Sequence, residues 1–167
     1  MRVLVTYGSK RGGTAGLAAM IGDALKESGC ESIVSPAKDT HIAHFDAVIV
    51  VGALYAGRWH RDARQFVRRN TMLLRKLPVW LVSSGPLDDS AEQHEIPPTK
   101  QVSKLATRIG ARGHATFGGR LAPDAEGFPA SAMAKTKAGD WRDPAHVRRW
   151  IGAVANELQA VGMRVDS

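Results

Sequence analysis

Short apolar runs alternate with segments of helical period along most of the chain. The apolar runs, rich in β-branched residues, occupy residues 2–7, 32–35, 47–52, 79–84 and 114–118. Apolar residues recur at helical spacing within residues 17–25, 63–77, 102–109 and 147–161. This alternation predicts an α/β fold in which helices cover both faces of a parallel sheet. No linker or repeat divides the chain, so we expect a single domain over residues 1–167.

Glycine and proline residues predict where several of these elements begin and end. Gly29 and Gly110 are placed to end two helices, and Pro78 to end a third. Asp143 followed by Pro144 predicts the start of the last helix. The stretch 120–142 has no sustained period and is expected to form a long irregular loop.

In parallel sheets, ligands bind beyond the carboxyl ends of the strands, which here means the loops after Tyr7, Gly52 and Ser84. The first loop, residues 8–14, has small residues that let backbone N–H groups approach an anion at a helix start. It lacks the Gly-Lys-Ser/Thr ending of a Walker A loop, and its glycines do not fit the dinucleotide fingerprint. A single terminal phosphate is the better fit; the alternative is an ordinary tight turn.

The second loop, residues 53–60, contains the aromatic residues Tyr55 and Trp59 around Gly57. A planar heterocycle can lie against either ring, and the glycine permits a peptide to reorient toward it. Aromatic packing at a helix start is the alternative interpretation. The third loop, residues 84–90, offers backbone N–H groups and small side chains but no aromatic residue.

Two of these segments carry a resemblance to a known family. Residues 7–14 resemble the FMN phosphate loop of the flavodoxin superfamily. Gly57, His60 and the pair Phe66-Val67 resemble the branch that contains menaquinone-dependent protoporphyrinogen IX dehydrogenase. The resemblance covers residues 1–117 and 140–154, whereas residues 120–142 are shorter and less apolar than the insertion of that enzyme.

The resemblance implies a flavodoxin-like three-layer α/β/α sandwich with a five-stranded parallel sheet in the order 2-1-3-4-5, and FMN as the cofactor. The cofactor-binding residues that it implies are Ser9, Lys10, Arg11, Gly12, Gly13, Thr14, Ala53, Leu54, Tyr55, Ala56, Gly57, Trp59, Ser84, Gly85, Pro86 and Leu87. His60 is the candidate for proton transfer, because an imidazole titrates near neutral pH; a role at the helix start is the alternative.

The chain has 23 Lys and Arg residues against 16 Asp and Glu residues, a formal net charge of +7. This excess favours anionic partners. Residues 58–76 hold seven of the cations and one acid, and Arg58, Arg61 and Arg64 are the candidates for contact with an anionic substrate. A solvated outer face is the alternative. No nucleic-acid-binding motif accompanies the charge, so nucleic acid is not expected as a partner.

The single cysteine, Cys30, excludes a disulfide framework and a cysteine-ligated metal cluster within one chain, and no other metal site is expected. We see no signal peptide or membrane-length apolar run and expect a cytoplasmic protein with at most peripheral membrane contact.

The hypothesis from sequence is an FMN-dependent oxidoreductase acting on a small anionic substrate, such as a carboxylated tetrapyrrole, or on a redox partner. Two alternatives are a non-catalytic FMN electron carrier and a flavin-free module that binds an anionic partner. A net charge of +7 differs from the acidic character typical of flavodoxin carriers.

Overall fold

The sheet of this computed structural model, which describes residues 1–9, 12–85, 90–121 and 139–165, has five parallel strands. They are β1 (Arg2–Gly8), β2 (Glu31–Pro36), β3 (Ala47–Tyr55), β5 (Val79–Ser84) and β6 (Gly113–Phe117). Their spatial order is β2-β1-β3-β5-β6. This arrangement confirms the predicted order 2-1-3-4-5, with the strands counted along the chain.

Burial explains which strands were easiest to recognise. In the central strands β3 and β5, residues 47–51 and 79–82 are all at most 2% exposed. Strands covered on both faces are continuously apolar, as these are. The edge strand β2 is different, because Ile33 and Val34 are each 38% exposed. The apolar run that predicts this strand, residues 32–35, is correspondingly short.

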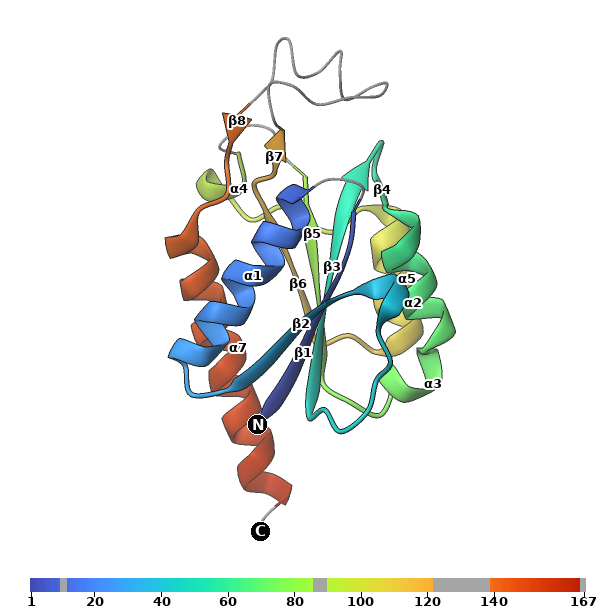
Figure 1. The fold of residues 1–167 in the computed structure, drawn as a ribbon, viewed down its shortest axis with the longest axis vertical. Helices are drawn as coiled ribbons and strands as arrows, with labels where there is room; N and C mark the ends of the chain where they lie inside the picture. The colour runs from blue at the N-terminus through green and yellow to red at the C-terminus, as the bar shows by residue number, and fades with distance from the viewer. Residues whose placement is uncertain (10–11, 86–89, 122–138, 166–167) are drawn as a thin grey trace.

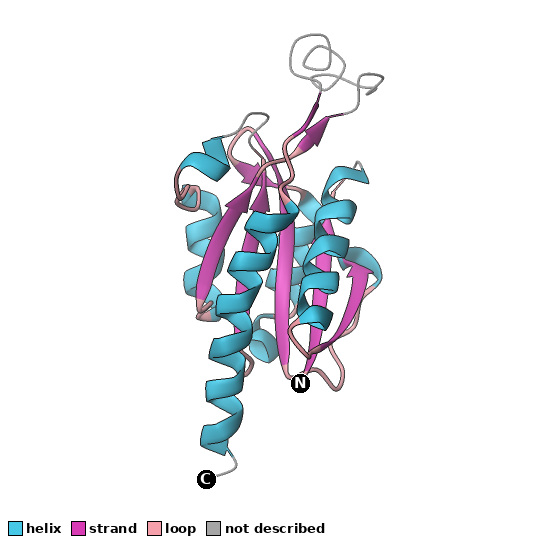
Figure 2. Cartoon of the chain, turned by 90° about the vertical axis from the view of Figure 1, so that its left-hand side faces the viewer, coloured by secondary structure: helices cyan, strands magenta, loops and turns pink. Residues whose placement is uncertain are grey.

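Helices cover both faces of the sheet, as predicted. On one face lie α1 (Gly12–Glu27) and α7 (Pro144–Val165), which run across the front of the sheet in Figure 2. On the other face lie α2 (Arg61–Arg69), α3 (Thr71–Leu74) and α5 (Lys100–Ile109), with the short η1 (Ala37–Asp39) beside α2 (Figure 1). The four-residue α4 (Ser90–Gln93) follows β5 and was not predicted. Among the described residues, no helix combines the length and the apolar character needed to cross a membrane.

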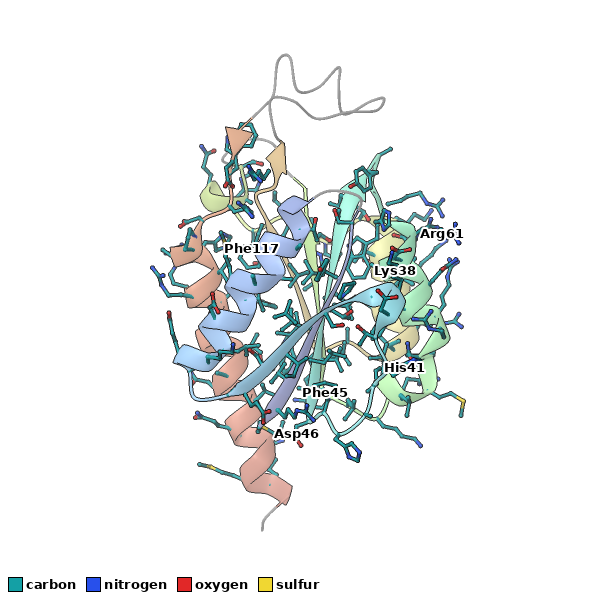
Figure 3. All side chains as sticks on the ribbon, in the orientation of Figure 1. Lys38, His41, Phe45, Asp46, Arg61 and Phe117 are labelled. Carbon is teal, nitrogen blue, oxygen red and sulfur yellow. The ribbon has the colours of Figure 1, made fainter. Side chains whose placement is uncertain are left out.

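Each face of the sheet has its own apolar core. On the α1/α7 face, the predicted stripes of both helices pack against β1, β3 and Phe117. On the α2/α5 face, Phe66, Leu74 and Leu105 are among the side chains that pack against Val48, Val50 and Leu81. Figure 3 shows Phe117 and Arg61 on opposite sides of the sheet.

The predicted helix ends are confirmed at two glycines and one aspartate. Gly29 and Gly110 adopt left-handed backbone angles, with φ of 88° and 64°. At the start of α7, Oδ1 of Asp143 accepts a hydrogen bond from the N–H of Ala145 at 3.0 Å. Such a bond satisfies one of the free donors at a helix N-terminus.

The helix predicted across residues 63–77 is divided at Asn70, and that prediction is therefore wrong in its length. Asn70 has φ of −108° and ends α2, after which α3 begins. The Nδ2 of Asn70 donates to the carbonyl oxygen of Phe66 at 2.9 Å. The hydroxyl of Thr71 donates to the carbonyl oxygen of Val67, also at 2.9 Å. These side chains donate hydrogen bonds to the carbonyl oxygens of the preceding turn. Such bonds compete with the backbone hydrogen bonds of a continuing helix and so disfavour its continuation.

Two small β-elements were also missed. The two-residue strand β4 (Arg58–Trp59) folds back antiparallel on the end of β3. Within the stretch 120–142, expected to be irregular, β7 (Arg120–Leu121) pairs antiparallel with β8 (Gly139–Asp140). The residues between them, 122–138, lie outside the described part of the chain. Two-residue strands are too short for a period-2 pattern to reveal.

Candidate functional site

The three predicted ligand loops converge at one edge of the sheet. Gly8 at the end of β1 is in register with Gly52 of β3, and Ala53 is in register with Ser84 at the end of β5. Between β1 and β3 the chain order along the sheet reverses, which is the switch point where α/β proteins bind ligands. This edge is the upper end of the sheet in Figure 1.

The first loop joins β1 to α1. Ser9 follows the strand, the helix begins at Gly12, and Lys10 and Arg11 lie outside the described residues. Thr14 is 4% exposed in the first turn, which contains no acidic residue. A Cβ added at Gly13 would lie 3.1 Å from the backbone oxygen of Arg120, so β7 packs closely against this helix start. The helix dipole and the small residues make this loop suitable for an anion.

The second loop contains the turn between β3 and β4. Tyr55 pairs with Arg58, and the two residues between them both have positive φ, 51° at Ala56 and 77° at Gly57. Positive φ at both central positions is typical of a type I′ hairpin turn. Glycine adopts this conformation freely, but at Ala56 it costs about 1 kcal/mol. The half-buried Tyr55 lies edge-on to His60, with 6.1 Å between ring centroids.

Trp59 does not lie at the rim of this site, which corrects its expected role in contacting a heterocycle. The side chain is 1% exposed, on the face of the sheet covered by α2 and α5. Its ring occupies the space where a Cβ at Gly52 would be, and its Nε1 donates to Oγ of Ser83 at 2.9 Å. Alternate residues of a strand point to opposite faces, so Arg58 is exposed while Trp59 is buried.

His60 caps the start of α2. Its Nδ1 accepts a hydrogen bond from the N–H of Asp62 at 3.3 Å and lies 3.8 Å from the carboxylate of the same residue. The backbone N–H of His60 donates to the backbone carbonyl oxygen of Ala53 at 2.8 Å, which fixes the hairpin to the helix. The alternative role of His60 at the helix start is therefore present, and proton transfer stays a prediction.

The second and third loops contact each other through Leu54. A Cβ added at Gly85 would lie 2.9 Å from Cδ1 of Leu54, so glycine permits this approach. The N–H of Gly85 donates to the carbonyl oxygen of Phe117 at 3.2 Å, and Ser84 is 6% exposed. Pro86 and Leu87, the other predicted members of this loop, lie outside the described residues.

The three arginines predicted to meet an anionic substrate gather at the hairpin and the start of α2. Burial is the largest cause that lowers the pKa of Arg64. The positive charges of Arg58, Arg68 and Arg61 lower it further. Among the described residues, no group accepts a hydrogen bond from the buried Nε of Arg64. Arg64 thus lies among like charges.

Two residues near the site were not singled out from the sequence. His114 on β6 lies with its Nε2 2.8 Å from Oγ of Ser83, the same hydroxyl that accepts from Trp59. Burial lowers the pKa of His114 to about 4, so the ring is neutral at pH 7. A neutral Nε2 without a proton is the acceptor that the Ser83 hydroxyl needs, since that oxygen already accepts the indole N–H.

Arg142 is the second, and it secures the start of α1. Its guanidinium donates to both carboxylate oxygens of Asp140, at 2.9 and 2.7 Å, and to the carbonyl oxygen of Gly13 at 3.3 Å. The side-chain hydrogen bonds between Asp140 and Arg142 lower the pKa of Asp140 and raise the pKa of Arg142. A local sequence pattern cannot predict the contact between Arg142 and Gly13, because these residues are 129 positions apart.

The fold and these loops define an α/β protein with a ligand edge at the switch point of its sheet. The family model described as "Flavodoxin domain" matches residues 4–133. The chain therefore belongs to the flavodoxin domain family. No curated protein sequence matches it.

Solved structures show the same fold at low sequence identity. A cysteine-to-serine mutant of flavodoxin from Pseudomonas aeruginosa is 17% identical with a TM-score of 0.60; the match covers 95% of this chain and 99% of that one. A flavodoxin from the domain Archaea is 12% identical with a TM-score of 0.61 and the same coverage. A flavone reductase is 13% identical with a TM-score of 0.59, covering 97% of this chain and 64% of that one.

Proposed function

We propose that the chain binds FMN at the edge formed by the three loops and acts as an oxidoreductase. The observation that carries this proposal is the first loop, where Ser9, Gly12, Gly13 and the buried Thr14 surround the start of a 16-residue helix with no acid in its first turn. A terminal phosphate suits such a loop, because backbone N–H groups, a hydroxyl and the helix dipole all favour negative charge.

The second and third loops would hold the flavin ring. Tyr55 is half-buried on the hairpin, and Leu54 lies against Gly85 of the neighbouring loop. When bound, FMN supplies a ring that accepts and releases one or two electrons. The chain's own contribution is to anchor the phosphate, to orient the ring with the hairpin and to exclude water with apolar side chains.

The substrate that we propose is a carboxylated tetrapyrrole of the protoporphyrinogen type. Support comes from Arg58 and Arg61, which are exposed beside the hairpin, and from the half-buried Arg64 one turn further along α2. A guanidinium binds a carboxylate through two parallel hydrogen bonds, so these residues would position an acidic substrate. His60, at the start of α2, is the residue that we propose for proton transfer.

The flavin proposal is tested by titrating the purified protein with FMN and following flavin fluorescence. Thr14→Val keeps the shape of the side chain and removes its hydroxyl. We expect FMN affinity to fall about tenfold or more, since a hydrogen bond to a charged group contributes roughly 1.5–3 kcal/mol. Thr40→Val, a buried threonine in the loop after η1, is the matched control. Absence of binding after reconstitution with excess FMN would contradict the proposal.

The substrate proposal is tested separately, on protein that already contains FMN. Protoporphyrinogen IX should reduce the flavin under anaerobic conditions, and Arg61→Gln should raise KM with a smaller change in kcat. Arg75→Gln, at the exposed end of α3, serves as the control. Flavin binding without reduction above background would exclude this substrate and favour the electron-carrier alternative.

A further inference from the structure

A basic pocket lies beside the hairpin, between α2 and α5. Its volume is about 750 Å³, within the range of pockets that bind small molecules. It is lined by Gly57, Arg58, Arg68, Thr99, Lys100, Gln101, Lys104, Leu105 and Arg108. Five of these nine residues are cationic and none is acidic, so the pocket is chemically different from an ordinary solvated groove.

The five cations come from three separate elements: the hairpin, α2 and α5. No salt bridge joins any of them to a carboxylate within the described residues. Arg108 is held in place, because its Nε donates to the hydroxyl of Thr71 at 2.8 Å. Like charges in one pocket repel each other, and an anion bound among them relieves that repulsion.

Neutral donors complete the lining. Oε1 of Gln101 accepts a hydrogen bond from the N–H of Trp59 at 3.1 Å, which fixes the orientation of the amide. The Nε2 of the same amide is buried and has no hydrogen-bond partner among the described residues. The hydroxyl of Thr99 accepts from the N–H of Val102 at 3.4 Å, which leaves its proton available to donate. A buried donor without an acceptor is uncommon in proteins, and an ordered water or a bound anion at this position would satisfy it.

We propose that this pocket binds a small, multiply charged anion that carries two or more phosphate or carboxylate groups. Five cations around one concave site require several negative charges, and the arginine side chains can bind such groups through two parallel hydrogen bonds. The pocket shares Gly57 and Arg58 with the hairpin of the proposed flavin and substrate site, but no residue of the first loop lines it. It is therefore a second anion site besides the one proposed for the FMN phosphate. It does not depend on flavin binding.

The lowered pKa of Arg64 supports the same conclusion. Two of the charges that lower it belong to Arg58 and Arg68, which line the pocket. Burial is the larger cause of this lowered pKa, and the charges of Arg58 and Arg68 add to it.

Calorimetric titration of the full chain with tripolyphosphate and with citrate tests the proposal. We expect saturable binding of at least one of them with a stoichiometry of one. The double variant Lys100→Gln/Lys104→Gln should weaken that binding about tenfold or more. The control double variant Lys26→Gln/Arg149→Gln removes the same charge from exposed positions on α1 and α7, and should change affinity less than twofold.

Three results would overturn the proposal. They are no saturable binding of either anion, equal weakening in both double variants, and binding of a polyglutamate peptide without binding of the small anions. The last would assign the pocket to an acidic protein segment. FMN titration of the same variants distinguishes the two proposals. If the protein binds FMN, Lys100→Gln/Lys104→Gln should leave that affinity unchanged. If it does not, the anion titrations still decide whether the pocket binds an anion.

Discussion

Arg142 and the cations of the basic pocket lie on opposite sides of the sheet and differ in their partners. On the α1/α7 side, Arg142 is 12% exposed in its side chain and is paired with Asp140 through two hydrogen bonds. On the α2/α5 side, the basic pocket holds five cations without a salt bridge to any described carboxylate. The paired arginine fixes one loop of the site, whereas the unpaired cations remain available for a ligand. The net charge of +7 is thus not a uniform property of the surface.

The largest expected effect concerns the core beneath the basic pocket. Trp59→Ala should lower the free energy of unfolding by about 3–5 kcal/mol, because it leaves a cavity and removes the donor to Ser83. Trp150→Ala, on α7, should cost less, since that side chain is only partly buried. Urea denaturation measures both. Equal losses would show that the hairpin is no more dependent on its tryptophan than α7 is.

The next largest effect tests the paired arginine. Arg142→Ala should lower the free energy of unfolding by about 1–3 kcal/mol, since it removes bonds to Asp140 and to the carbonyl of Gly13. FMN affinity should fall as well, because the start of α1 loses its support. Arg149→Ala, at an exposed position on α7, should stay within about 0.5 kcal/mol of the unchanged protein. Thermal unfolding with and without FMN checks both expectations.

A third test uses pH. The folded chain lowers the pKa of His114 from 6.5 to about 4, so between these values the unfolded chain binds more protons. The stability that the folded chain gains from keeping His114 neutral is fully present above pH 6.5, and it is lost as the pH falls toward 4. We expect about 1–2 kcal/mol after allowance for the partial exposure of the ring. Urea denaturation between pH 4 and 7 measures it.

The variant His114→Gln removes the titrating group and provides the control for that measurement. Its stability should vary less with pH across the same window. An unchanged slope would mean that other groups carry the pH dependence and that burial of His114 has no thermodynamic consequence.

The smallest effect comes from relieving repulsion on α2. Arg61→Gln should raise the free energy of unfolding by about 0.2–0.5 kcal/mol at low salt, because Arg61 and Arg64 are like charges three residues apart. The gain should disappear at high ionic strength, where exposed charges are screened. Arg148→Gln on α7 should show no such gain in chemical denaturation. A salt-independent gain would point to a cause other than charge.

The strands, most of the helices and the three ligand loops could be predicted from the sequence, because each rests on local signals. The order of the strands in the sheet was implied only by the resemblance to the flavodoxin superfamily, since strand pairing joins residues far apart in the chain. Buried parallel strands such as β3 are continuously apolar, and helices such as α7 carry a regular stripe. The position of Trp59 could not be predicted, because a two-residue strand has no period that shows which face its side chains meet. The break at Asn70 depended on side-chain bonds to the preceding turn.

The sequence by itself determined the class of fold, the order of its elements and the loops at which a ligand can bind. Only the tertiary structure decided which charges are paired, which aromatic ring is buried and where the basic pocket lies. Local patterns specify how each segment folds, since they reflect backbone preference and burial on one face. The hydrogen-bond partners of Arg142 and Gln101 are residues far apart from them in the chain, and such contacts exist only once the layers have packed.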